Sequence, residues 1–312
     1  MSTVTEQVIR SMATLGYQIR VISIDRLQEL QAELEATRST YKEVDEHLKR
    51  YLDAFDFTKP ADFTEAQSII IVAAPQPIVR VHFEWKDAVH AILIPPMYLL
   101  NTGVENEPFH KNVLKITEAL SETLRPMNYR LKKHHIPCKL LAARSGLAEY
   151  GRNNVCYVEG QSSYYWMGAY LSDMPCDHDS WQEIRTMDNC VDCDRCARQC
   201  PTGAIPDDRF LLRAGRCMTL HNESSGILPT WISPFWNNAL IGCMRCQLVC
   251  PVNRKAGMPI QDSVTFDESE TAMLLENRSF EHLSPETVQK LEQINFIEDY
   301  ELLCRNLIPL LR

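Results

Sequence analysis

Eight of the twelve cysteines in this 312-residue chain fall within residues 190–250, and their spacing restricts what that stretch can fold into. The first run is Cys190, Cys193, Cys196 and Cys200, followed by Pro201. The second run is Cys217, Cys243, Cys246 and Cys250, followed by Pro251. Three thiolates separated by two residues can bind separate irons of one cube, while the fourth serves a neighbouring cube. The pattern is therefore typical of a module with two 4Fe-4S clusters.

The exchange of one cysteine between the two clusters assigns the ligands of each. The first cluster is predicted to bind Cys190, Cys193, Cys196 and Cys250. The second is predicted to bind Cys200, Cys217, Cys243 and Cys246. Residues 218–242 are inserted after Cys217, so we expect them to loop out between two ligands of the second cluster. Within this insertion, Asn222-Glu223 either faces the cofactor or forms a capped loop.

Zinc and disulfides are the alternative uses of closely spaced cysteines. Zinc sites usually take two Cys-x2-Cys pairs per ion and need neither the third cysteine nor the Cys-x3-Cys-Pro ending. Disulfides are rare in the cytosol. We expect a cytoplasmic protein, because Met1–Arg10 has neither an apolar signal region nor a twin-arginine pair. The sequence therefore favours iron–sulfur clusters.

The overall charge and hydropathy exclude several classes of protein. The formal net charge is −9, which argues against a chain whose main task is to bind nucleic acid. The longest apolar run, Ser68–Pro75, has the length of a strand and not the roughly 20 residues that span a bilayer. We therefore expect no membrane partner.

The distribution of cysteines divides the chain into three consecutive parts. Residues 1–185 hold only three cysteines and are predicted to form one mixed α and β domain. Residues 186–256 are predicted to form the cluster module. Residues 257–312 are predicted to be a helical segment that packs back on the core.

A few elements of these parts can be predicted from hydrophobic periodicity. Ser68–Ala74 is typical of a buried strand, and Lys139–Tyr150 is predicted to be a helix. The acidic segment Met258–Glu270 is predicted to be a connector. Two closing helices are predicted over Pro285–Gln293 and Phe296–Leu311.

Two clusters in one module imply an electron acceptor, and the first domain is the natural place for its cofactor. No G-x-G-x-x-G follows a strand and no G-x4-G-K-S/T occurs, so neither a Rossmann nicotinamide site nor ATP-driven chemistry is supported. The D-x-H-x-x-G motif that supplies a histidine to cobalamin is also absent. A flavin stays open as an alternative.

Three segments outside the cysteines resemble one family. Ser145–Asn154 (SGLAEYGRNN) resembles its A-G-L-G-x-x-G-x-N turn, and Gln161–Gly168 (QSSYYWMG) resembles its G-S-x-x-x-L-G strand. Ser68–Ala74 matches a further strand. Together with the interrupted second cysteine run, these segments make the chain similar to epoxyqueuosine reductases and to the catalytic core of reductive dehalogenases, over roughly residues 5–256.

The resemblance implies a fold and a function. The expected fold is α+β, with a nitroreductase-like cobalamin-binding domain fused to a ferredoxin-like module that holds two 4Fe-4S clusters. Low-potential electrons would pass through the clusters to a base-off corrinoid, which reduces a small substrate. The residues implied to bind the corrinoid are Gly146, Leu147, Gly151, Asn153, Ser162, Ser163 and Tyr164.

The proton donor departs from the family pattern. The family's aspartate aligns here with Lys132, or with His134 if a small gap is allowed. Tyr150 beside Arg152 is a second candidate, because a phenol next to a basic side chain can donate a proton. The alternatives are a core aromatic residue at Tyr150 and a solvated residue at His134.

The resemblance also implies partners. We expect a low-potential electron donor such as ferredoxin or flavodoxin, and a small-molecule substrate or a partner corrinoid protein. We do not expect tRNA, because the helical repeats with which those reductases hold tRNA are largely missing and the tail is acidic. The alternative functions are an electron-transfer protein that activates a partner's corrinoid and a flavin-bearing iron–sulfur oxidoreductase.

Overall fold

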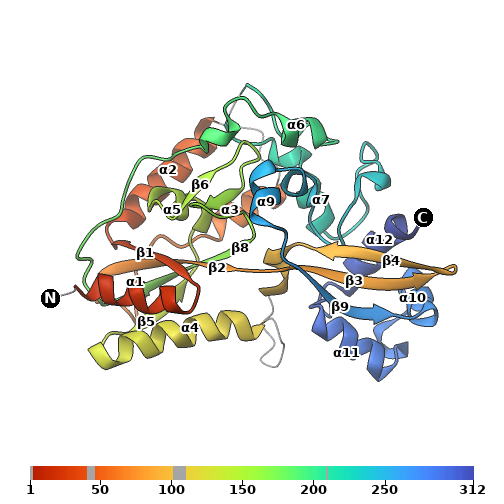
Figure 1. Cartoon of the computed structure of the whole chain (residues 1–312), viewed down its shortest axis with the longest axis horizontal. Coiled ribbons are helices and arrows are strands. Elements are labelled where there is room, and N and C mark those ends of the chain that lie inside the picture. Colours follow the sequence, from red (N-terminus) through yellow and green to blue (C-terminus); the bar gives the residue numbers. More distant parts are fainter. Residues whose placement is uncertain (1–2, 41–45, 101–109, 209) are drawn as a thin grey trace. The chain divides into compact units, whose positions relative to one another are not determined.

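The computed structural model describes residues 3–40, 46–100, 110–208 and 210–312, and it divides the chain into two compact units. Unit 1 consists of residues 1–75 and 115–194, and unit 2 of residues 76–114 and 195–312. Both units mix helices and strands, which agrees with the predicted α+β class. Figure 1 shows the elements along the chain.

Unit 1 is built on an antiparallel sheet with the strand order β1-β2-β8-β5. Its strands are β1 (Gln18–Ser23), β2 (Ser68–Pro75), β8 (Tyr165–Ser172) and β5 (Leu131–His134). The predicted strand is confirmed as β2, whose residues are buried up to Ala74. A strand that is apolar at every position can be buried on both faces. β2 therefore lies inside the sheet, between β1 and β8.

Helices and a small hairpin complete unit 1 (Figure 1). The helices are α1 (Val4–Thr14), α2 (Arg26–Thr40), α3 (Glu46–Asp53), α4 (His110–Leu124, which belongs to unit 1 from Lys115 on), η2 (Arg125–Met127), α5 (Cys138–Arg144) and η3 (Asp188–Cys190). The hairpin pairs β6 (Ala148–Tyr150) with β7 (Cys156–Val158). The prediction of one helix over Lys139–Tyr150 is wrong after Arg144. Gly146 has a φ of +69°, which ends the helix and turns the chain into β6.

Unit 2 contains a three-stranded sheet in the order β4-β3-β9. β3 (Ile78–Trp85) and β4 (Ala88–Ile94) form a hairpin, whose turn residues Lys86 and Asp87 have φ values of 52° and 59°. β9 (Ile260–Phe266) pairs with β3 in parallel. One apolar cluster joins the sheet to α10 (Glu268–Leu275), α11 (Pro285–Gln293) and α12 (Tyr300–Leu307).

Cys196 and Cys246 lie within short helices of unit 2, and the other cysteines of the two runs in this unit lie beside such helices. These are α6 (Arg195–Gln199), η4 (Ala214–Arg216), α7 (Met218–Glu223), η5 (Pro234–Trp236), α8 (Arg245–Leu248) and α9 (Pro251–Ala256). The remaining single turns are η1 (Pro96–Leu100), η6 (Phe280–His282) and η7 (Ile308–Leu311). No helix among the described residues combines the length and the apolar character needed to cross a bilayer.

The units cut across the three parts expected from the sequence. Residues 76–114 group with the C-terminal half of the chain, because β3 takes β9 as its partner. The segment predicted as a connector, Met258–Glu270, therefore contains a sheet strand. The two closing helices are confirmed as α11 and as α12 continued by η7.

Candidate iron–sulfur centre

The cysteines of both runs lie at turns and at the starts of short helices. Cys217 precedes α7, and Cys250 precedes α9, where Pro251 occupies the first helical position. Proline is favoured there because its missing N–H has no partner in the first turn of a helix. None of the twelve cysteines, all of which lie among the described residues, forms a disulfide.

Three of the four predicted ligands of the second cluster influence one another within unit 2. Burial raises the pKa of the Cys217 thiol, and the nearby Cys200 adds to that shift. Burial also raises the pKa of Cys243 to about 11, with Cys217 and Cys200 contributing. Three thiols from separate segments therefore lie close together. Bound iron would reverse these shifts, because a coordinating thiol is deprotonated by the metal.

The surroundings of these sulfurs fit a cluster with cysteine ligands. The amide of Ala204 donates to Cys200 Sγ at 3.4 Å, and Thr202 Oγ1 lies at the same distance from it. The backbone amides of Thr219 and Arg245 donate to Cys217 and Cys243. Hydrogen bonds to thiolate sulfur tune the reduction potential of an iron–sulfur cluster. Among the described residues, no three His, Cys, Asp or Glu side chains are arranged for a single metal ion.

Arg152 holds the loop that carries Cys190. Its amide donates to Cys190 Sγ at 3.5 Å. Its guanidinium donates to the carbonyl oxygens of Cys190 and Val191, each at 3.3 Å. This sequence-predicted residue therefore contacts a predicted cluster ligand. The first ligand set has members in both units, namely Cys190 and Cys193 in unit 1 and Cys196 and Cys250 in unit 2, and it stays a prediction.

Tyr150 belongs to the apolar core of unit 1, where it is only 7% exposed. Its hydroxyl forms a hydrogen bond with the Cys156 thiol. Burial raises the pKa of this phenol well above its usual value, and Cys156 adds to the shift. A phenol with a raised pKa gives up its proton less readily. The structure thus shows the core aromatic residue of the alternative interpretation, and proton donation by Tyr150 stays a prediction.

His134 ends β5 and is 8% exposed. Burial lowers its pKa, although the neighbouring Asp56 opposes that shift. Its ring is therefore held neutral near pH 7. The buried Nε2 atom has no hydrogen-bond partner in the described part of the chain. Because the ring is buried, the interpretation of His134 as a solvated residue is wrong. A buried ring nitrogen of this kind fits an interaction with a bound group.

The residues predicted to bind a corrinoid have roles inside unit 1. Asn153 Nδ2 donates to Tyr157 Oη at 3.1 Å, and a Cβ at Gly151 would lie 2.6 Å from the same ring. A Cβ at Gly146 would lie 2.8 Å from Gln182 Nε2. Ser162 Oγ accepts a hydrogen bond from the Tyr164 amide at 3.2 Å. The remaining members, Leu147 and Ser163, are buried. Contact with a corrinoid stays a prediction for all of them.

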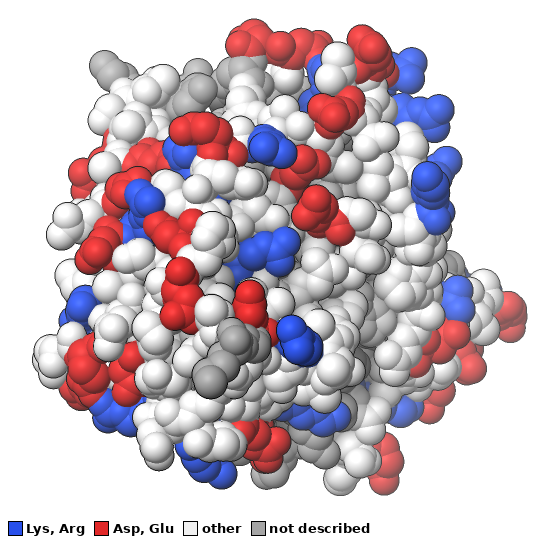
Figure 2. Space-filling view, turned by 60° about the vertical axis from the view of Figure 1, so that its left-hand side comes forward, with Lys and Arg blue, Asp and Glu red and all other residues white. Residues whose placement is uncertain are grey.

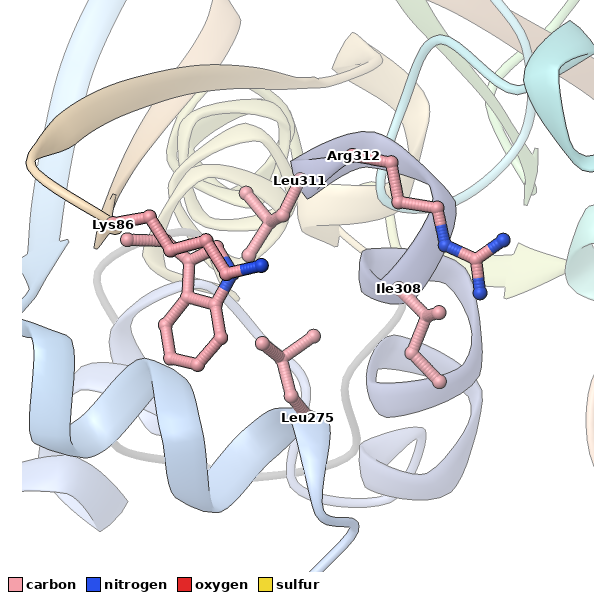
Figure 3. A pocket seen from close by; sticks show the side chains of 6 residues that line it. Lys86, Leu275, Ile308, Leu311 and Arg312 are labelled. Atoms are coloured by element: carbon pink, nitrogen blue, oxygen red, sulfur yellow. The ribbon is translucent and has the colours of Figure 1, made fainter.

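A cavity of about 300 Å³ lies elsewhere in unit 2 and contains none of the predicted site residues. The lining includes Trp85 and Lys86. Figure 3 shows Lys86 beside an indole ring, with Leu275 and Leu311 facing the same space. Arg312 extends past Ile308 on the opposite side.

Sequence reasoning missed Tyr98, which lies beside the second ligand set. Its hydroxyl bonds the carboxylate of Glu223. Burial raises its pKa well above the usual value, and Glu223, Cys217 and Cys243 all add to the shift. Tyr98 follows Pro95-Pro96, and this local sequence signals only the end of β4.

Comparison with known proteins first defines the class of the cysteine-rich stretch. Residues 189–253 match the family model described as a 4Fe-4S double cluster binding domain. All eight cysteines of the two runs lie within these residues. The chain therefore carries a 4Fe-4S double cluster domain.

Two comparisons extend beyond this domain. The chain is 32% identical over 145 residues to the epoxyqueuosine reductase of Aliivibrio fischeri, covering 46% of this chain and 38% of that protein. It is 31% identical over 155 residues to that of Pseudomonas aeruginosa, covering 47% and 42%. The chain thus matches about two fifths of the length of these curated relatives.

Solved structures of epoxyqueuosine reductase share the fold of the whole chain. One, a selenomethionine-labelled form, has a TM-score of 0.67 at 19% identity and covers 98% of this chain and 80% of its own. Another, with a tRNA-Tyr stem loop that carries epoxyqueuosine, has a TM-score of 0.66 at 20% identity and the same coverage. The predicted resemblance to epoxyqueuosine reductases and the α+β fold are confirmed. The nitroreductase-like description stays a prediction.

The tRNA-bound structure corrects one expectation. A reductase with this fold binds a tRNA stem loop, so the prediction that tRNA is not a partner is wrong. That prediction relied on the missing helical repeats and the acidic tail, and the net charge of −9 had argued against nucleic-acid binding in general. Contacts with phosphates depend on local groups of Lys and Arg. Figure 2 shows basic side chains interspersed with acidic ones on the face in view.

Proposed function

We propose that this chain is an iron–sulfur reductase that acts on a modified nucleoside in tRNA. Its relatives are named epoxyqueuosine reductases, and one solved structure of such a reductase contains a modified tRNA stem loop. The proposal is carried by one combination of features. The chain has a double cluster domain, and its fold matches that of an epoxyqueuosine reductase over 98% of this chain. Eight cysteines are available for two clusters, and each cluster transfers one electron at a time. The same proposal places the protein in the cytoplasm.

The reaction determines what the residues of this chain must supply. Reductive removal of an epoxide oxygen takes two electrons and two protons, and it yields an alkene and water. Two one-electron centres can deliver the electrons in sequence. Protons must come from a side chain or from solvent, and His134 has a buried ring nitrogen without a partner among the described residues. Arg152 places a positive charge on the loop of Cys190.

A corrinoid is the cofactor that the resemblance favours, and when bound it would supply a strongly reducing metal centre near the substrate. Its support is the similarity of Ser145–Asn154 and Gln161–Gly168 to the family's segments. The orphaned Nε2 of His134 in unit 1 is compatible with a bound group.

The test begins with anaerobic reconstitution of the purified protein. We expect about eight irons per chain, four for each cluster. Hydroxocobalamin and dithionite are then added, the sample is desalted, and absorbance and EPR spectra are recorded. A retained base-off cob(II)alamin signal supports the corrinoid, and clusters without retained corrinoid contradict it. The protein is then incubated with a stem loop that carries epoxyqueuosine, and mass spectrometry should show that the nucleoside has lost one oxygen atom. An unchanged nucleoside would contradict the proposed substrate.

A variant pair tests the ligand assignment. Cys217→Ser should lower the iron content to about half, because one of two four-iron clusters loses a ligand. Cys304→Ser is the matched control, since Cys304 is buried in the apolar core of unit 2, outside both runs. Equal iron contents in the two variants would contradict the assignment of Cys217.

Two observations favour a second function, an electron-transfer protein that reduces the corrinoid of a partner. The predicted corrinoid-binding residues Asn153 and Ser162 form hydrogen bonds within unit 1, and the family's aspartate is missing. Under this alternative, the corrinoid leaves the chain on gel filtration while a separate corrinoid protein becomes reduced in its presence.

A further inference from the structure

The insertion between Cys217 and Cys243 is organised around one buried amide. Asn222, in α7, is fully buried. Its Nδ2 atom donates to Gly242 O at 2.8 Å, to Asn237 Oδ1 at 3.1 Å and to Ala239 O at 3.3 Å. A side chain that begins five residues after Cys217 therefore binds the residue directly before Cys243.

The C-terminal helix α12 holds this arrangement from outside the cysteine-rich stretch. Asn306, which is buried, donates from Nδ2 to Leu240 O at 2.8 Å and to Asn222 O at 3.0 Å. Arg305 donates from Nη1 to the carbonyl oxygens of Ser224 and Gly226 at 2.6 and 2.7 Å. It also reaches those of His221 and Asn222 at 3.3 and 3.2 Å. The oxygens of His221 and Asn222 belong to the last turn of α7, where carbonyl groups lack helical partners.

Tyr98, which follows β4 in η1, contacts the turn at Gly242. Gly242 has a φ of +66°, and a Cβ there would lie 2.3 Å from Tyr98 Oη. The same hydroxyl bonds Glu223, the neighbour of Asn222. The amide of Asn295 in turn donates to Tyr98 O at 3.1 Å. Gly242 is thus held between Asn222 and Tyr98, and the direction in which Cys243 leaves the turn is fixed.

A long insertion makes such support necessary. Two ligands separated by residues 218–242 are held together only if the loop between them is closed, and closing a flexible loop costs entropy that grows with its length. A network that closes the loop before iron binds removes this cost from the binding step. Residues that do not bind the metal themselves but hydrogen-bond to its ligands and orient them have a large effect on metal affinity.

We propose that Asn222 is a positioning residue for the second cluster and that Arg305 and Asn306 of α12 are the support that holds it in place. The inference rests on the proposed assignment of Cys200, Cys217, Cys243 and Cys246 to that cluster. It makes a helix at the far end of the chain part of the cofactor site.

The test compares the loss of iron to a chelator from reconstituted proteins. Asn222→Leu keeps the approximate size of the side chain and removes its donors. We expect its second cluster to lose iron about 10- to 100-fold faster than the wild type, the range for residues that orient metal ligands. EPR-monitored redox titration should show a shifted potential for that cluster only. Asn306→Asp keeps the acceptor for Arg305 but removes both donors, and it should have an intermediate effect.

A control separates positioning from general loss of stability. Thr287 is fully buried and bonds Glu270 in the same unit, without a hydrogen bond to the insertion. Thr287→Val should lower the melting temperature and leave the iron loss and the potentials of both clusters unchanged. Wild-type loss rates and potentials in Asn222→Leu and Asn306→Asp would overturn the inference. If the wild type itself fails to take up two clusters, the proposed function fails instead.

Discussion

At the scale of single residues, the chemistry of His134 follows from its burial. The ring lies at the end of β5, and burial lowers its pKa below the usual value near 6.5, against the effect of Asp56. From the sequence alone this histidine could be a proton donor or a solvated residue, and its burial excludes the solvated residue. The neighbouring His135 and Lys132 contribute to the lowering of the His134 pKa.

The lowered pKa of His134 predicts a pH dependence of stability. An unfolded chain binds a proton on this ring more readily than the folded one, so stability is lost as pH falls through the unfolded pKa. We expect the free energy of unfolding in urea to decrease between about pH 7.5 and about pH 5.5. In His134→Gln this decrease should be smaller. A decrease of equal size in both proteins would contradict the assignment.

At the scale of elements, α10 shows how a charged side chain stabilises the helical side of unit 2. Asp267 and Glu270 form a reciprocal capping box at its start. Glu270 is buried, accepts a hydrogen bond from Thr287 Oγ1 at 3.0 Å, and pairs with Lys290 of α11. The cap is visible in the sequence as Asp-x-x-Glu, but the pairing with α11 is not. A buried carboxylate needs all of these partners, because losing one leaves an unsatisfied charge.

This network predicts a clear difference between two glutamates. Glu270→Gln should lower the free energy of unfolding by about 2 kcal/mol, since a buried hydrogen-bonded ion pair loses its charge. Glu276→Gln should change it by less than about 0.5 kcal/mol, because Glu276 pairs with Arg278 at the surface. Urea unfolding of both variants is the measurement. Similar losses in the two would show that Glu270 has no special role.

The sequence specified local features well and distant pairings poorly. The cysteine spacing and the buried strand β2 depend on neighbours in sequence, so both could be predicted. The pairing of β3 with β9 joins Ile78 to Ile260, and nothing near either residue identifies the other. The same holds for Tyr98 and Asn306, which reach the candidate site from β4's end and from α12. Contacts of this kind appear only when the chain has folded.

At the scale of the whole molecule, the pairing of β3 with β9 joins the two chain segments of unit 2, residues 76–114 and 195–312. We therefore expect the first segment to fold only when the second is present. A fragment of residues 1–256 contains every cysteine of both runs and matches the first two parts predicted from the sequence. It lacks β9 and α10–α12, which supply much of the apolar cluster against which Val81 and Phe83 pack. It also lacks Arg305 and Asn306.

We therefore predict that this fragment does not form unit 2. Amide hydrogen exchange should show protection in β2 and β8 of unit 1, because their partners are all present. It should show little protection in β3 and β4, whose inner face would be exposed to water. Native-like protection of residues 78–94 would contradict the argument, since it would mean that the hairpin is stable without β9. The cluster domain would then be separable from the C-terminal helices, as the cysteine distribution alone suggests.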